Sequence, residues 1–245
     1  MNPEMMLFST TEIINYFQQI GTLKHQQNLK KRGIPEATLL GVPMILIRKL
    51  AKKIGKNQTL ALELWASKLY EAQLLAVLIA DSDQTSPELL EIWLNEVNSR
   101  ELCDHLSHYL IARVETAKVY LIKWARDSRE FFRRAAFNTI TMRVLYHYYT
   151  VDELDLFLDL IWECSFDSRI YVKKAVSFAL REIGRIGVAE RDRAVALASE
   201  LVADGTKTQR WIGKNALKEL ENLKHFEDQT SDFNRLMTTT LVTAK

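Results

Sequence analysis

The chain has 245 residues, of which 47% are apolar and 26% are charged, and its formal net charge is +2. This balance is ordinary for a soluble globular protein and excludes the disordered and membrane classes. Glycine and proline are rare, at 8 and 4 residues, whereas the residues that favour helices are common. We therefore predict an all-α protein.

Helical patterns follow one another along the chain. The apolar spacing predicts helical segments over residues 10–31, 43–55, 58–81, 86–97, 100–113, 118–128, 151–165 and 168–184. Ser86 before Pro87 is typical of a helix start, and the glycines of "IGKNQ" and "IGRIG" are typical of helix ends. Because no stretch rich in Pro, Gly or Ser divides the chain, we expect one repeat domain over residues 1–225 and a poorly ordered tail over 226–245.

Two features bear on location and metal binding. The most apolar stretch, 72–80, is about half as long as the roughly 20 residues that a bilayer span needs, and the N-terminus lacks the order of a signal peptide. Cys103 and Cys164 are too few for a disulfide framework and do not pair with His at zinc-ligand spacing. We expect a cytoplasmic protein without metal or cofactor, whose thiols are reduced and packed as small apolar groups.

One sequence pattern returns at a fixed step of 40 residues. "DSREFFRRAAF" (127–137) is followed by "DSRIYVKKAVSF" (167–178), and the same step brings "TKTQRWIGKNAL" (206–217) into register. A period near 40 with two helices per unit is typical of HEAT-like repeats, in which each helix pair buries its apolar face by stacking on its neighbours. We predict a HEAT-like solenoid in which the second helix of each pair faces the concave side. The Asp-Ser pair is expected to cap this inner helix, and the Arg is expected to form ion pairs with acidic residues of the previous unit.

The repeat brings cationic residues to equivalent positions of the inner helices. These are Arg133, Arg134, Lys173, Lys174, Arg181 and Lys214. Stacking places several of them on one strip along a phosphate backbone, although ordinary solvated helix charges would give the same pattern. A second basic face is formed by Lys49, Lys52, Lys53 and Lys56 at helical spacing. The sequence thus predicts a monomer that holds double-stranded DNA at both flanks.

An acidic residue lies one helical turn after a basic one in the segment "VNSRELCDHL" (97–106). Arg100 and Asp104 share a helix face there, with Glu101 on a neighbouring face. A carboxylate turned into a basic groove can orient water or stabilise a developing cation on a sugar, as carboxylates do in glycosidic bond cleavage. The alternative is structural, with Asp104 paired to Arg100 or to Arg134 of the next repeat.

Five strings taken together resemble one known family. "GVPMILIRKLAKKIGKN…LALELWASKLYEAQLLAVLIAD", "VNSRELCDHL", "REFFRRAAF", "VKKAVSFALREIGR" and "RWIGKNALKEL" are similar to the AlkD-like DNA alkylation repair family over roughly residues 40–220. The resemblance implies a HEAT-like solenoid whose basic concave face holds duplex DNA. In active members it implies an N-glycosylase that releases cationic 3- and 7-alkylpurines, with aromatic rings against the sugar and a carboxylate that steadies the oxocarbenium charge.

The resemblance also assigns roles to four residues. The catalytic Asp of the family falls on Asp104 and its groove Arg on Arg134, whereas its two tryptophans fall on Arg100 and Phe178. Phe178 keeps a ring, but Arg100 places a fixed cation beside the carboxylate, where a cationic substrate would also lie. These departures predict weak or absent excision.

The tryptophans of the chain bear on the alternative function. All five lie at apolar helix positions and are expected in the core: Trp65, Trp93, Trp124, Trp162 and Trp211. A HEAT-like scaffold that binds a protein partner is the alternative to DNA binding, and it requires an exposed apolar stripe on the inner helices.

Overall fold

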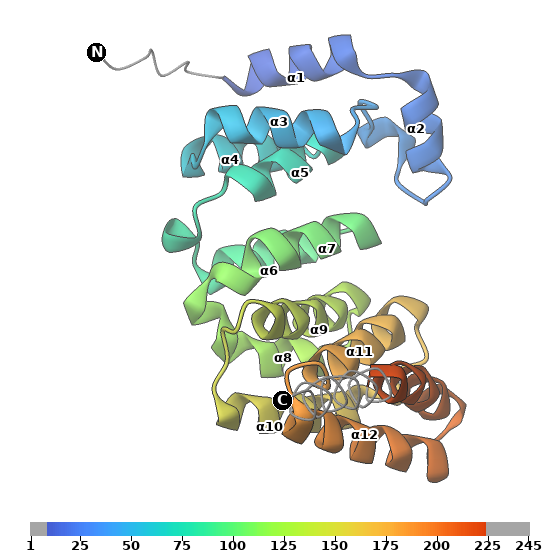
Figure 1. Ribbon diagram of the computed structural model, residues 1–245. Coiled ribbons are helices and arrows are strands. Elements are labelled where there is room, and N and C mark those ends of the chain that lie inside the picture. Colours follow the sequence, from blue (N-terminus) through green and yellow to red (C-terminus); the bar gives the residue numbers. More distant parts are fainter. Residues whose placement is uncertain (1–8, 224–245) are drawn as a thin grey trace, which may run out of the picture. The chain divides into compact units, whose positions relative to one another are not determined.

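The computed structural model describes residues 9–223, and every regular element in this range is a helix (Figure 1). The all-α prediction is therefore confirmed over the described part of the chain. The chain divides into two compact units, Met1–Met142 and Arg143–Lys245. The single domain over 1–225 stays a prediction, and the tail over 226–245 lies outside the described residues.

The first unit is built from short helices. They are α1 (Thr10–Ile20), α2 (Leu23–Lys30), η1 (Glu36–Thr38), α3 (Met44–Ile54), α4 (Gln58–Ala66), α5 (Tyr70–Ile79), η2 (Ser82–Gln84), α6 (Pro87–Glu96), α7 (Arg100–Tyr109), η3 (Ile111–Arg113), η4 (Glu115–Tyr120), α8 (Leu121–Arg126) and α9 (Glu130–Leu145), whose last three residues belong to the second unit. Figure 1 shows them following one another along the unit. Ser86 caps α6 and Pro87 is its first residue, as predicted.

Helix α5 forms the centre of this unit. Every residue from 70 to 77 is buried, and α5 packs against α3, α4 and α7. The apolar stretch 72–80 is thus a core segment, and none of the helices described in 9–223 is long and apolar enough to cross a bilayer. Stacked rings of Trp65 and Trp93, with centroids 4.1 Å apart, join α4 to α6.

Two predicted segments each contain a pair of α-helices rather than one. Segment 10–31 breaks at Gly21, where a Cβ would lie 1.9 Å from the carbonyl oxygen of Leu40, and where Thr22 donates its N–H to Gly41. Segment 58–81 breaks at Lys68, which has a left-handed φ of 58°. The first break is thus explained by the close approach of the segment that contains Leu40. The apolar periodicity of residues 10–31 gives no sign of such a contact.

The second unit has α10 (Val151–Cys164), α11 (Ile170–Ile183), α12 (Val188–Ala203) and a helix over 207–223. Helix α11 packs against both α10 and α12. Gly184 ends α11 as predicted, and a Cβ there would meet the side chain of Leu220 at 2.6 Å. The glycine therefore allows the end of α11 to approach the last helix closely.

The repeated Asp-Ser-Arg string forms the same turn twice. Asp127 accepts the backbone N–H of Arg129 at 2.8 Å, and Asp167 accepts that of Arg169 at 3.0 Å. Both guanidinium groups also bind the Asp of their own turn, and this bond lowers the pKa of Asp127. The Asp thus fixes the turn that leads into α9 or α11. The acid that each Arg binds here belongs to its own turn, and not to the previous unit as was predicted.

Candidate functional site

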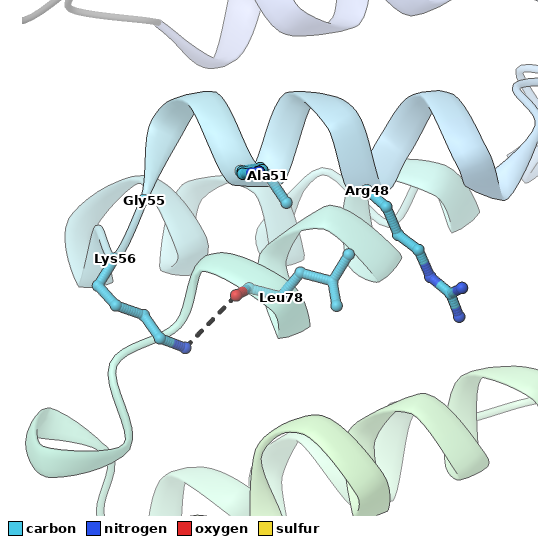
Figure 2. Close-up of a pocket in the computed structure, with 6 residues that line it drawn as sticks. Arg48, Ala51, Gly55, Lys56 and Leu78 are labelled. Carbon is cyan, nitrogen blue, oxygen red and sulfur yellow. Dashed lines mark hydrogen bonds between the residues drawn. The ribbon is translucent and has the colours of Figure 1, made fainter.

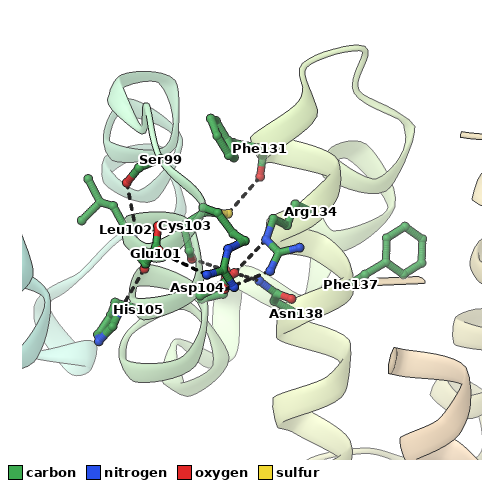
Figure 3. A network of polar contacts seen from close by, with 12 residues as sticks. Ser99, Glu101, Leu102, Cys103, Asp104, His105, Phe131, Arg134, Phe137 and Asn138 are labelled. Atoms are coloured by element: carbon green, nitrogen blue, oxygen red, sulfur yellow. Dashed lines mark hydrogen bonds and ion pairs between the residues drawn. The ribbon is translucent and has the colours of Figure 1, made fainter. Parts of the chain in front are cut away.

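The carboxylate of Asp104 is the centre of a polar network in the first unit (Figure 3). Helix α7 supplies Asp104, and α9 supplies Arg134 and Asn138. Arg134 donates from Nε to Oδ1 at 2.8 Å and from Nη2 to Oδ2 at 2.9 Å, a two-pronged pair. Asn138 donates from Nδ2 to Oδ1 at 2.7 Å. Sequence reasoning missed Asn138, although it lies one turn after Arg134 on the same face of α9.

Arg100 adds a second cation to this carboxylate. Its Nη1 lies 3.6 Å from Oδ2 of Asp104, and its Nη2 donates to Glu101 at 2.9 Å. Two guanidinium groups and two carboxylates thus meet, and Arg32 lies 4.0 Å from Glu101 as a third cation. The side chain of Arg134 is 8% exposed, that of Asp104 is 19% exposed and that of Arg100 is 44% exposed. Arg134 is therefore buried, Asp104 is half-buried, and Arg100 is the most exposed member of the network.

The geometry bears directly on the two interpretations of Asp104. The structural alternative named both Arg100 and Arg134 as partners, and both contact Asp104. A carboxylate has about four lone-pair directions, and three of them here accept hydrogen bonds from Arg134 and Asn138. The structure therefore brings the predicted residues Asp104, Arg134 and Arg100 together, in an arrangement that neutralises the carboxylate.

The histidines next to this network are half-buried, and Cys103 is buried. Burial lowers the pKa of His105 and of His108, so that both rings favour the neutral form. Cys103 and Cys164 are both buried thiols, and burial raises the pKa of Cys103. Within residues 9–223, no three His, Cys, Asp or Glu side chains gather as a metal site would require.

The basic face of α3 is partly available to a ligand. Lys49, Lys52 and Lys53 are exposed and pair with no carboxylate within the described range. Lys56 differs, because its ammonium donates to the carbonyl of Leu78 at 3.4 Å, as Figure 2 shows. It also donates to the carbonyl of Ala80 at 2.6 Å. Partial burial lowers its pKa. Three of the four predicted lysines therefore form a solvent-exposed strip, and the fourth caps the C-terminal end of α5.

The predicted cations of the repeats have different surroundings. Arg133 donates from Nε to the carbonyl of Ala125 at 2.8 Å, next to the end of α8. Arg181 pairs with Glu219 and lies over the ring of Phe178, 5.1 Å from its centroid. Phe178 belongs to the second unit, on α11, and its ring faces this guanidinium.

Lys173, Lys174 and Lys214 are also in the second unit. Lys174 and Lys214 are exposed and have no carboxylate partner in the described part of the chain. Lys173 lies 4.9 Å from the ring centroid of Trp211. A common face for Arg134, Lys174 and Lys214 stays a prediction, since Arg134 belongs to the first unit.

The tryptophans were predicted to lie in the core, and two do not. Trp65, Trp93 and Trp124 are buried, whereas Trp162 is 44% exposed and Trp211 is half-buried. Trp211 shares a hollow with Lys173, Lys207, Arg210 and Lys214. Apolar helical spacing placed Trp211 correctly on a helix but gave no sign that its face is open, so sequence reasoning missed it.

Comparison with solved structures identifies the class of the fold. One of the chains that match has a TM-score of 0.69 and 19% sequence identity, over 84% of this chain and 93% of that chain. It is described as belonging to a new family of proteins related to the HEAT-like repeat DNA glycosylases, with affinity for branched DNA structures. The likeness confirms the predicted HEAT-like repeat fold.

The family follows from the sequence as a whole. The model of the DNA alkylation repair enzyme family matches residues 13–220, and the chain belongs to that family. No curated protein matches the chain. Family membership confirms the predicted resemblance, while the reaction and the ligand have to be argued from the residues present.

Proposed function

We propose that this protein binds double-stranded DNA through phosphate contacts, prefers branched duplexes, and excises alkylpurine bases weakly or not at all. The observation that carries its catalytic half is the neutralised carboxylate of Asp104, which accepts three hydrogen bonds from Arg134 and Asn138 and lies 3.6 Å from Arg100.

The charges around Asp104 argue against efficient excision. Cleavage of a glycosidic bond develops positive charge on the sugar, and a nearby carboxylate accelerates the reaction when its charge faces that cation. Here two guanidinium groups face the same carboxylate. They offset its attraction for a developing cation and repel a cationic alkylpurine. The most exposed of these groups is Arg100, at the position where the resemblance places a tryptophan.

The unpaired lysines support DNA binding. Lys49, Lys52 and Lys53 in the first unit, and Lys174 and Lys214 in the second, are exposed and free of carboxylate partners within residues 9–223. Such ammonium groups bind phosphates and release counterions without reading base sequence. The affinity for branched DNA described for the similar structure makes a junction the first ligand to test.

Base release from duplex DNA tests the catalytic half of the proposal. Under single-turnover conditions, the native protein is expected to release little 7-methylguanine or 3-methyladenine. Arg100→Trp is expected to raise release, because it removes one opposing cation and restores a flat apolar surface. Asp104→Asn is expected to abolish what remains. Robust native release that survives Asp104→Asn would contradict this assignment.

Salt-dependent binding tests the other half. Replacing Lys49, Lys52 and Lys53 by Gln is expected to weaken duplex and four-way-junction binding at every sequence, and to lower the salt slope by about 1 for each phosphate that the variant no longer neutralises. Lys68→Gln is the matched control, since Lys68 already pairs with Glu96 at 2.5 Å. Replacing Lys173 and Lys174 together by Glu is expected to have the same effect as the triple variant.

The alternative function is a scaffold for a protein partner. It predicts DNA affinity that is absent or insensitive to these lysines, and it needs an exposed apolar stripe on the inner helices. On α11 the exposed positions are Ile170 and Lys174, and Arg185 follows just after its end. One apolar side chain beside two cations does not make such a stripe, so DNA binding is the better-supported function. Unchanged DNA binding in both lysine variants would favour the scaffold.

A further inference from the structure

A hollow of about 440 Å³ in the second unit gathers cations around an aromatic ring. Lys173 comes from α11, and Lys207, Arg210, Trp211 and Lys214 come from the helix over 207–223. None of the residues that line it carries a carboxylate. Concentrated positive charge in a concave site strengthens the local field and favours an anionic ligand.

The residues of the last helix form one face. Lys207, Trp211 and Lys214 are spaced at about one turn each, so their side chains point the same way. Lys207 and Lys214 are exposed and have no carboxylate partner within residues 9–223. Arg210 donates from Nη1 to the carbonyl of Gly205 at 2.6 Å, which fixes the group beside the hollow and leaves its other donors for a ligand.

Lys173 on α11 forms the wall of the hollow opposite the last helix. Its ammonium lies 4.9 Å from the ring centroid of Trp211, a cation–π contact that holds the charge over the indole. The half-buried ring adds an apolar surface next to the charges. A ligand that fits both features has a strongly charged anionic group joined to an apolar or aromatic part.

We propose that this hollow, the Trp211 pocket, binds the terminal phosphate of a DNA strand, with the adjoining nucleoside against Trp211. The inference rests on the proposed function as far as DNA is the ligand. A phosphodiester carries a single negative charge, whereas a terminal phosphate carries about −1.5 to −2 at pH 7. Lysines spaced along one helix face, such as those of α3, fit the singly charged phosphodiesters along a DNA backbone. Four cations around one hollow fit the more highly charged terminal phosphate.

A hairpin DNA with a single end tests the proposal in two otherwise identical forms, one with a 5′-phosphate and one with a 5′-hydroxyl. The native full-length protein is expected to bind the phosphorylated form about fivefold more tightly, the effect of roughly one additional charge at a solvated cationic site. Lys214→Gln and Lys173→Gln are expected to remove this preference. Equal affinity of the native protein for the two hairpins would overturn the proposal.

Lys174→Gln is the matched control. Lys174 is the sequence neighbour of Lys173 and is equally cationic, but it does not line the Trp211 pocket. This variant is expected to lower affinity for both hairpins while keeping the preference for the phosphate. If the preference persists in both pocket variants, or disappears equally in the control, the pocket is not its source.

A second measurement separates this proposal from the proposed function. The protein is labelled with fluorotryptophan, and the fluorine NMR signal of Trp211 is identified by its loss in Trp211→Phe. The chemical shift of this signal is expected to change when a 5′-phosphorylated dinucleotide is added, but not with the 5′-hydroxyl form. A shift without any hairpin binding would refute duplex binding and leave the pocket intact. Hairpin binding with neither a shift nor a preference would refute the pocket and leave the proposed function intact. A 3′-phosphorylated hairpin shows whether one end or both are recognised.

Discussion

Replacing Asp104 by Asn is expected to destabilise the protein, whatever it does to base release. The guanidinium of Arg134 is 8% exposed and donates twice to this carboxylate, at 2.8 and 2.9 Å. An amide can accept one such bond, but its NH₂ group faces a second donor and carries no compensating charge. The cost is therefore that of leaving a buried cation without its anion, rather than that of losing one hydrogen bond.

The size of this effect follows from the burial of the pair. Breaking a fully buried ion pair costs about 3–5 kcal/mol. Because Asp104 is 19% exposed and water reaches its edge, the lower part of that range applies. We expect a loss of about 3–4 kcal/mol in the free energy of unfolding, a drop of roughly 6–16 °C in the melting temperature of a chain of this length.

Urea unfolding followed by circular dichroism provides the assay. A double-mutant cycle with Arg134→Gln isolates the pair, and its coupling energy is expected to exceed about 1.5 kcal/mol. Arg100→Gln is the control, because that side chain is 44% exposed and lies 3.6 Å from the carboxylate, and it is expected to cost less than about 1 kcal/mol. A coupling below about 0.5 kcal/mol would refute the assignment of Asp104 as a structural anion.

Two further predictions concern the first unit. Glu71 is buried and accepts three backbone N–H groups of residues 40–42 at 2.7 to 3.2 Å. Glu71→Gln is expected to cost about 2–3 kcal/mol in urea unfolding, whereas Glu63→Gln, at an exposed site, is expected to stay within about 0.5. Burial lowers the pKa of His105 and His108, so the unfolded chain binds more protons near pH 6. Stability is therefore expected to fall as the pH drops from about 7 to 5, and Gln at both positions is expected to flatten that dependence.

The sequence predicted the helices well where their limits are local. Ser86 and Pro87 define the start of α6, and glycines end α3 and α11 at the predicted places. The break at Gly21 was not predictable in the same way, because it depends on a carbonyl of the distant residue Leu40. Local signals thus fix helix ends, while contacts between segments interrupt a helix whose apolar pattern continues.

Most residues of the candidate site were predictable from the sequence, but the hydrogen bonds and ion pairs between them were not. The spacing of Arg100 and Asp104 and the repeat position of Arg134 allowed either a free carboxylate or a paired one. The structure pairs it and adds Asn138, whose amide is common on helix surfaces and gave no signal of its own. Trp211 shows the same limit, since an apolar position on a helix does not reveal whether the neighbouring helix covers it.

The repeat therefore sets where a cation lies in the sequence pattern, and the helix packed beside it sets what that cation binds. Arg134 and Lys214 occupy equivalent positions of the 40-residue pattern. Arg134 forms an ion pair with Asp104 on α7, whereas Lys214 lines a hollow whose lining residues include no carboxylate. An ammonium that exchanges water for phosphate releases counterions, while a guanidinium already held by a carboxylate does not. The salt dependence of DNA binding should consequently follow the unpaired lysines and not the total number of cationic residues.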